Sequence, residues 1–191
     1  MATIFMLRHG DTEYSKLKNI CGVSNPPLSG EGRRKALKRK AALEEYHFDS
    51  TYTSPLIRCT ETLQIMAPEI RYEIDSRLIE IDFGELEGKP IKDVFSENRD
   101  TPDTYSDDWE TYHFPKGDNM ADYFDRAGET VRTFAGKKED AILLVTHNGF
   151  INSVIANLVY RDIGKLFTVP CHTCDIIKLW EENGRFHHEI L

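Results

Sequence analysis

The sequence contains no long apolar run. Residues 4–7 form the first such run, and the longest one after it covers only residues 141–145. A secretory signal peptide needs roughly 7–15 apolar residues and a membrane-spanning helix about 20, so we expect neither. The chain has 191 residues, 40% of them apolar, which is enough to bury one hydrophobic core. We therefore expect a single soluble domain over residues 1–191, located in the cytoplasm.

Positive charge is scarce as well, because 24 Lys and Arg residues stand against 32 Asp and Glu residues and give a formal net charge of −8. Proteins that attract nucleic acid or anionic lipid through their overall field carry the opposite sign. We therefore expect neither nucleic acid nor a membrane among the partners. The one basic cluster, residues 33–40, contains no aromatic residue, and we interpret it as the solvated face of a helix.

Cysteine is rare, with four residues in the whole chain and no dense spacing pattern. A secreted disulfide scaffold is therefore excluded, and we expect reduced thiols. Cys171 and Cys174 form a C-x-x-C pair with His172 inside it, a pattern that can bind zinc or cycle as a disulfide. No second pair accompanies it. We interpret these cysteines as packing residues before the last strand and expect neither a metal site nor a cofactor.

The glycine-rich loops that hold nucleotide phosphates are missing, because neither G-x-x-x-x-G-K-[ST] nor G-x-G-x-x-G occurs. Nucleotide-driven chemistry therefore has no support. The chain also has no internal repeat, no low-complexity tract and no linker rich in Pro, Gly or Ser. Nothing in it indicates a division into several domains, and nothing indicates an oligomeric state.

Short apolar strands alternate with amphipathic helices. Strands are predicted over residues 3–7, 50–53, 69–74 and 141–145, helices over residues 29–46, after Pro55, and over 119–134 and 148–159, and a closing hairpin over 175–180 and 186–190. Ser29 and Asn119 are the predicted N-caps, and Asn183-Gly184 is the predicted hairpin turn. This alternation predicts a three-layer α/β fold with a mostly parallel central sheet and helices on both faces.

Ligands of open α/β sheets bind beyond the carboxyl ends of the strands. The polar residues that follow the predicted strands are Arg8 and His9, residues 54–58, Arg77 and Glu80, and Thr146 and His147. We expect these side chains to meet at one edge of the sheet. Two histidines, arginines that keep their charge and one carboxylate suit a tetrahedral phosphate dianion, because phosphoryl transfer depends on positioning and charge stabilisation.

These residues resemble a known family. The sequence RHGDT at residues 8–12 is similar to the Arg-His-Gly signature of the histidine phosphatase superfamily, which has the phosphoglycerate-mutase-like fold. Further segments match the motifs of that family in the same order: residues 25–32 (NPPLSGEG), 54–62 (SPLIRCTET), 78–88 (LIEIDFGELEG) and 145–149 (VTHNG). Each motif alone is weak, but together they span nearly the whole chain and are highly specific.

The resemblance implies a role for each matching residue. His9 would attack phosphorus and become a phosphohistidine. Glu80 would protonate the leaving oxygen and then deprotonate the hydrolytic water, although Asp82, Glu85 and Glu87 lie close to it in sequence. The residues implied to hold the phosphate are Arg8, Arg58, His147 and Thr12, and those implied to contact the substrate are Ser15, Cys21, Gly22 and Asn148. The substrate would be a small phosphorylated metabolite, and no metal would be required.

The segment between Glu80 and His147 sets this chain apart from the mutases of the family, in which it is longer and carries a basic cluster for a second acidic group. Here residues 97–110 are acidic. We therefore expect a phosphatase that disfavours substrates with a second acidic group, and we interpret residues 85–117 as a specificity insertion. Aromatic residues in this region, namely Tyr105, Trp109, Tyr112 and Phe114, are candidates for walls of the substrate pocket.

Length and motifs most resemble the alpha-ribazole phosphatases and their broad-specificity relatives. Two other functions stay open: a phosphoglycerate-type mutase, and a module that binds phosphorylated ligands without catalysis. Ser15 is a departure from the family, which often has Asn at this position, and so is Asp118-Asn119 where the family usually has Glu-Ser. The first departure weakens a contact to phosphate, whereas the second leaves the central roles intact.

Overall fold

The computed structural model describes residues 1–94 and 110–191. In that part of the chain one sheet of six strands has the order β3-β2-β4-β1-β5-β6. Its strands are β1 (Thr3–Arg8), β2 (Ser50–Thr53), β3 (Glu73–Ile74), β4 (Ala141–Thr146), β5 (Ile176–Glu182) and β6 (Arg185–Ile190). β1, β2, β3 and β4 run parallel, while β5 pairs antiparallel with β1, and β6 with β5. The predicted, mostly parallel α/β sheet is confirmed.

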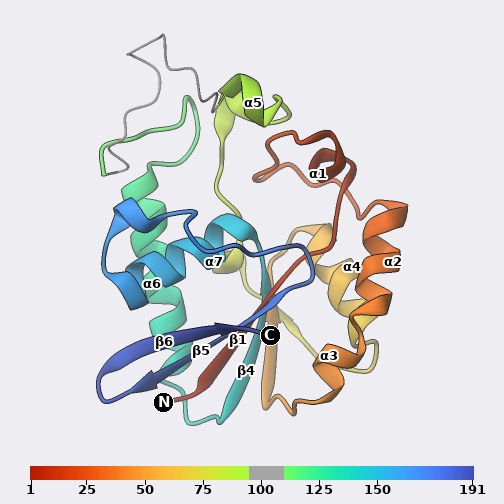
Figure 1. Cartoon of the computed structure of the whole chain (residues 1–191), viewed down its shortest axis with the longest axis vertical. Coiled ribbons are helices and arrows are strands. Elements are labelled where there is room, and N and C mark those ends of the chain that lie inside the picture. Colours follow the sequence, from red (N-terminus) through yellow and green to blue (C-terminus); the bar gives the residue numbers. More distant parts are fainter. Residues whose placement is uncertain (95–109) are drawn as a thin grey trace.

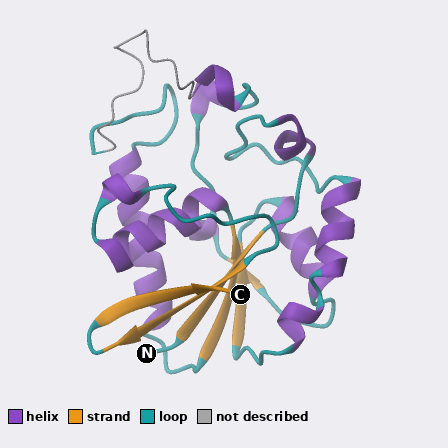
Figure 2. Ribbon diagram, viewed as in Figure 1, coloured by secondary structure: helices purple, strands orange, loops and turns teal. Residues whose placement is uncertain are grey.

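The helices of the described residues are α1 (Glu13–Leu17), α2 (Gly30–Lys38), α3 (Ala41–Glu44), α4 (Ile57–Met66), α5 (Ile91–Val94), α6 (Met120–Ala135) and α7 (Asn148–Ile155). The shorter turns are η1 (Ser76–Leu78), η2 (Gly84–Leu86), the π-helical η3 (Ala156–Tyr160) and η4 (Ile163–Lys165). Figure 2 shows helices on both sides of the sheet, which completes the three layers.

Successive side chains of the central strands point to opposite faces of the sheet, so the core consists of two hydrophobic clusters, one on each face. Ile4 and Met6 of β1 face a cluster that contains Phe150 of α7. Phe5 and Leu7 face the opposite cluster, which contains Ala36 of α2 and Leu63 of α4. Because β1 and β4 bury residues on both faces, they are the nearly continuous apolar runs typical of a covered parallel sheet.

The sequence-based boundaries hold at most elements and fail at two. Ser29 and Asn119 accept capping hydrogen bonds as predicted, and Asn183 and Gly184 both have the positive φ of a tight hairpin turn. The helix predicted over residues 29–46 is wrong, since it breaks between α2 and α3. Because of the break, Leu43 is buried in the core, whereas Leu37 of α2 is 62% exposed. The strand predicted over 69–74 shrinks to the two edge residues of β3.

The basic cluster at residues 33–40 is largely occupied by internal contacts. Arg33 pairs with Glu61 at 3.0 Å, and the Arg39 guanidinium donates to the carbonyls of Cys174 and Leu191. These contacts fit the face of a helix within the fold.

Among the described residues there is also no helix with the length and apolar character that a membrane crossing requires.

The parallel strands bring their carboxyl ends to one edge. Arg8 lies opposite Thr146 in the β1/β4 register, and Thr53 lies opposite Val145 in the β2/β4 register. Figure 1 shows α1 and α5 beyond this same end of the sheet. The residues that follow β1, β2 and β4 in sequence therefore face a common space between the sheet and these two short helices.

Candidate active site

A cavity of about 610 Å³ opens at this edge of the sheet. Its walls are formed by Arg8, His9, Asp11, Ser15, Lys18, Asn19, Ile20, Cys21, Lys35, Glu80, Phe83, Ile91, Asn148, Gly149, Phe167, His172 and Thr173. Volumes of roughly 300–1,000 Å³ are usual for pockets that enclose small organic ligands. The cavity thus has room for an ester larger than phosphate itself.

His9 follows β1 and is buried. Its Nδ1 lies 2.7 Å from the carbonyl oxygen of Gly10. Because a carbonyl can only accept, Nδ1 carries the proton and Nε2 keeps its lone pair. Burial lowers the pKa of His9 well below its usual value, and the charges of Arg58 and Arg8 lower it further. A neutral imidazole with a free Nε2 electron pair is the form that can attack an electrophile.

Arg58 lies in the first turn of α4 and is fully buried. Its Nε donates to His9 Nε2 at 3.2 Å, and its two terminal nitrogens donate to the carbonyls of Gly22 and Ser24 at 2.6 and 2.7 Å. The guanidinium therefore covers the lone pair of His9 in this structure. An incoming phosphorus atom must replace Arg58 Nε on that lone pair.

Arg8 ends β1 and lines the cavity. One terminal nitrogen donates to the carbonyl of Cys171. Its buried Nε has no hydrogen-bond partner within the described part of the chain. A buried charged donor without a partner is costly, so this atom is a candidate donor to an anion.

His147 caps α7 and is also fully buried. Its ring centroid lies 5.1 Å from that of His9, and its Nε2 lies 2.7 Å from Ser54 Oγ and 3.5 Å from Cys59 Sγ. Burial lowers its pKa well below the usual value, followed by the charges of Arg58, His9 and Arg8. The environment of each of the two rings therefore favours its neutral form.

Glu80 is buried, and its carboxylate lines the cavity. It accepts from Tyr123 Oη at 3.1 Å, from Gly149 N at 3.1 Å and from Ile81 N at 3.2 Å. A Cβ on Gly149 would lie 2.4 Å from Glu80 Oε1, so the start of α7 needs glycine to let the carboxylate approach. The neighbouring acids are directed elsewhere: Asp82 accepts from Gly84 N, and Glu85 pairs with Lys116.

The remaining predicted site residues divide into two groups. Ser15, Cys21 and Asn148 line the cavity, and burial raises the pKa of the Cys21 thiol to about 11. Gly22 reaches the site through its carbonyl bond to Arg58. Thr12 is fully buried as the N-cap of α1, where its hydroxyl is bonded to Ser15, and its implied contact to phosphate stays a prediction.

Arg77, which was also expected at this edge, lies outside the cavity. It pairs with Asp75 at 2.5 Å and stacks over the ring of Phe134 at 5.2 Å. The short η1 turn directs this side chain toward α6. The expectation that every polar residue after β3 faces the common space was therefore wrong.

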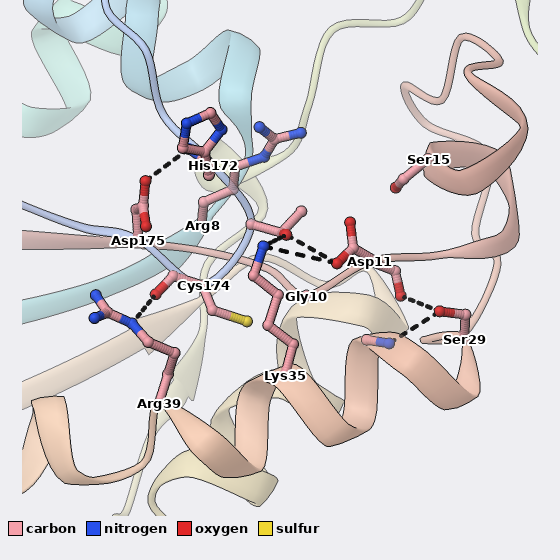
Figure 3. A network of polar contacts seen from close by, with 12 residues as sticks. Arg8, Gly10, Asp11, Ser15, Ser29, Lys35, Arg39, His172, Cys174 and Asp175 are labelled. Atoms are coloured by element: carbon pink, nitrogen blue, oxygen red, sulfur yellow. Dashed lines mark hydrogen bonds and ion pairs between the residues drawn. The ribbon is translucent and has the colours of Figure 1, made fainter.

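Sequence reasoning missed a polar network at the rim of the cavity, part of which Figure 3 displays. Lys35 Nζ donates to Thr173 Oγ1 at 2.6 Å and lies 3.9 Å from Asp11 Oδ2, to which Thr173 also donates at 3.0 Å. Lys35 belongs to the basic cluster interpreted as solvated. It was also not apparent that Tyr123, one of the apolar positions of a helix face, would bond to Glu80, because helical periodicity does not show where a hydroxyl points.

The C-x-x-C pair packs as predicted. Cys171 and Cys174 are buried and free of disulfides, and burial raises their pKa to about 12 and about 11. No group of three or more metal-binding side chains occurs in the described ranges.

The aromatic residues named as candidates for pocket walls lie elsewhere. Tyr112 and Phe114 pack in the core beside Phe83, while Tyr105 and Trp109 lie outside the described residues.

The two buried histidines predict a specific dependence of stability on pH. Both bind a proton in the unfolded chain below about pH 6.5 but stay neutral in the folded state until a lower pH. The free energy of unfolding should therefore fall as the pH falls from 6.5, by up to about 1.4 kcal/mol per histidine and pH unit. Urea unfolding of wild type and His147→Gln at pH 7.5 and 5.5 measures this effect. We expect a smaller fall in the variant, and an equal fall would contradict the prediction.

An α/β sheet whose carboxyl edge carries two neutral buried histidines, two arginines and a carboxylate defines a class of phosphoryl-transfer protein. The family model of the histidine phosphatase superfamily (branch 1) matches residues 4–190, and the chain belongs to this superfamily of enzymes. This result confirms the resemblance seen in the sequence.

Individual relatives agree with this assignment. Phosphoserine phosphatase 1 of Hydrogenobacter thermophilus is 22% identical over 97% of this chain and 89% of its own length. The 6-phosphofructo-2-kinase/fructose-2,6-bisphosphatase of Caenorhabditis elegans is 25% identical over 93% of this chain, which spans only 38% of that protein. The structure of the alpha-ribazole phosphatase from Shigella flexneri has a TM-score of 0.84 at 20% identity and covers 99% of this chain and 95% of its own. That last likeness concerns the fold.

Proposed function

We propose that this protein is a phosphomonoester hydrolase that works through a phosphohistidine at His9 and needs no metal ion. The observation that carries the proposal is the bond from His9 Nδ1 to the Gly10 carbonyl, which directs the Nε2 lone pair toward Arg58. Arg8, Arg58 and His147 supply the donors for the phosphate oxygens. Because Arg8 Nε has no hydrogen-bond partner among the described residues, it supports the proposal as a charged donor that a phosphate could engage.

Two steps complete the reaction. His9 Nε2 attacks phosphorus while the bond from phosphorus to the ester oxygen breaks, and protonated Glu80 gives its proton to that oxygen. Water then attacks the phosphohistidine, Glu80 takes a proton from the water, and the bond from phosphorus to Nε2 breaks. Inorganic phosphate leaves, and His9 and Glu80 return to their first states. Glu80 serves both steps because it lines the same cavity as His9.

Two partly exposed apolar side chains of the cavity favour a leaving group with an apolar part. Ile91 and Phe167 line the cavity while 45% and 43% exposed. Phe167 has a φ of 58°, a strained backbone conformation for an aromatic residue. We therefore propose a small phosphorylated metabolite as substrate, with alpha-ribazole 5′-phosphate as the candidate. Residues 85–117 would contribute to this specificity, and the four free thiols fit a location in the cytoplasm.

The expected bias against a second acidic group gains no support from the cavity walls. Lys18 lines the cavity and has no acidic partner in the described ranges. Lys35 lines the cavity as well, and its Nζ lies 3.9 Å from Asp11 Oδ2. The acidic stretch that motivated that expectation lies mostly outside the described residues. Doubly acidic esters therefore belong in any substrate test, and so does the mutase alternative.

The proposal is tested by assaying a panel of phosphomonoesters with EDTA present. The panel contains 1-naphthyl phosphate, alpha-ribazole 5′-phosphate, phosphoserine and 3-phosphoglycerate. We expect phosphate release in EDTA, fastest with the two esters that carry an aromatic ring, and an acid-labile phosphate on His9 after rapid quenching. Isomerised 3-phosphoglycerate without phosphate release would identify a mutase. Binding without turnover would identify a non-catalytic module, and loss of activity in EDTA would contradict the metal-independent mechanism.

A further inference from the structure

Glu87 makes an unusual set of contacts for an acid that lies outside the cavity walls. Its Oε1 accepts from Gly22 N and Val23 N at 3.0 Å each, and its Oε2 accepts from Gly22 N at 3.1 Å and Ser24 N at 3.3 Å. Phe83 N adds a longer bond of 3.4 Å. One carboxylate thus binds the amides of three successive residues. Hydrogen bonds to an ionised acceptor are about twice as strong as neutral ones.

The same loop holds Arg58 from its other side. The carbonyl groups of Gly22 and Ser24, whose amides bind Glu87, accept the two terminal nitrogens of Arg58 at 2.6 and 2.7 Å. Arg58 Nε in turn donates to His9 Nε2 at 3.2 Å. A continuous chain of hydrogen bonds therefore runs from Glu87 through residues 22–24 and Arg58 to the nucleophile.

The fit around the loop is tight. A Cβ on Gly22 would lie 1.9 Å from the carbonyl oxygen of Ile81 and 2.3 Å from Glu87 Oε1. Backbone bonds from Ile20 N to Lys89 O and from Gly88 N to Ile20 O join the neighbouring segments at 2.9 Å. These bonds do not involve the Glu87 side chain. The two segments should therefore stay together when that side chain is changed, while residues 22–24 lose their carboxylate.

We propose that Glu87 is a positioning residue that acts on catalysis through Arg58: its carboxylate holds residues 22–24, and their carbonyl groups hold the guanidinium against His9. The proposal rests on the proposed function for its catalytic consequence, but its structural part does not. Glu87 was considered in the sequence only as a neighbour of the acid Glu80. In the structure, Glu87 binds the amides of residues 22–24 and lies outside the cavity that Glu80 lines.

The sign of a histidine pKa change tests the structural part without any activity assay. The charge of Arg58 helps to lower the pKa of both His9 and His147. If Glu87→Gln releases Arg58, both pKa values should rise. Removing a negative charge has the opposite effect, because it disfavours imidazolium. The ionisable groups around His9 are Arg8, Arg58, His147 and Glu80, and the substitution leaves all of them in the chain.

The titration is followed by NMR of the imidazole signals, assigned with His9→Asn and His147→Asn. The matched control is Glu85→Gln. Glu85 lies two positions before Glu87 in the sequence, is exposed and pairs with Lys116. We expect higher pKa values for His9 and His147 in Glu87→Gln and unchanged ones in Glu85→Gln. Unchanged or lower values in Glu87→Gln would overturn the proposal. If Glu87→Gln does not fold, Glu87→Asp, which keeps the charge but shortens the reach, carries the same expectation.

A double-mutant cycle tests the catalytic part. Glu87→Gln should lower kcat/KM about tenfold and move the acid limb of its pH profile to higher pH. In an Arg58→Lys background the same substitution should have little further effect, because the group it positions is already gone. Additive losses would overturn action through Arg58. A wild-type protein without phosphatase activity would refute the proposed function, while the NMR result would still decide the role of Glu87.

Discussion

Replacing His9 by alanine should lower kcat/KM for every phosphomonoester by at least about 10⁴-fold, because the variant lacks the Nε2 atom proposed to form the covalent intermediate. The expected loss does not depend on the leaving group, since the nucleophile is needed for all of them. Steady-state assays of phosphate release measure this loss, with the wild-type enzyme diluted until its rate lies in the same range as that of the variant. Rapid quenching should also trap no phosphate on the variant.

Binding provides the control for this prediction. Arg8, Arg58 and His147 stay in place in His9→Ala, so inorganic phosphate should still bind. Removing the imidazole also frees Arg58 Nε, which now donates to His9 Nε2, and a bound phosphate oxygen can take its place. Calorimetric titration with phosphate should therefore give an affinity within about tenfold of wild type. Hydrolysis that survives in His9→Ala would show that another group, or water itself, attacks phosphorus.

Replacing Glu80 by glutamine should have an effect that depends on the leaving group. Glutamine cannot donate a proton to a departing alkoxide, so alkyl phosphates should lose about 10²–10⁴-fold in kcat. A nitrophenolate leaves without protonation, so the first step with p-nitrophenyl phosphate should be nearly unaffected. The second step still needs a base. We therefore expect an initial burst of nitrophenol followed by slow turnover.

Tyr123 and Glu85 provide matched controls for the Glu80 prediction. Tyr123→Phe removes the hydroxyl that donates to Glu80 Oε1 at 3.1 Å but keeps the acid, and a loss of up to about tenfold is expected. Glu85→Gln removes a neighbouring exposed acid and should have no effect. Equal losses with alkyl and nitrophenyl esters in Glu80→Gln would argue against a proton donor and in favour of a purely structural carboxylate.

The two proposals together describe a site in which few protein groups are free. The nucleophile is covered by Arg58, and Arg58 is held by carbonyl groups that Glu87 fixes. Such an arrangement keeps the imidazoles neutral without substrate, since a nearby fixed cation disfavours imidazolium. It also means that a phosphate ester must compete with internal partners for the guanidinium, so ordering of Arg58 matters for both binding and rate.

Most of the fold could be predicted because it depends on local patterns. The four consecutive buried residues of β1 and the buried run of β4 are visible as apolar stretches, and Ser29 and Asn119 are visible as caps. The errors occur where tertiary contacts compete with these patterns. The break between α2 and α3 lets Leu43 reach the core, a gain that no helical period reveals.

Motif order and the rule for parallel sheets were sufficient to bring Arg8, His9, Glu80 and His147 to one edge. The sequence by itself therefore determined the family, the alternation of elements and the set of chemical groups. The tertiary structure decided what each group touches. Arg58 and His9 are 49 residues apart, and Gly22 and Glu87 are 65 apart. Thr12 became a buried cap and Glu87 a support for Arg58, because hydrogen bonds between distant segments depend on distances that only the packed chain sets.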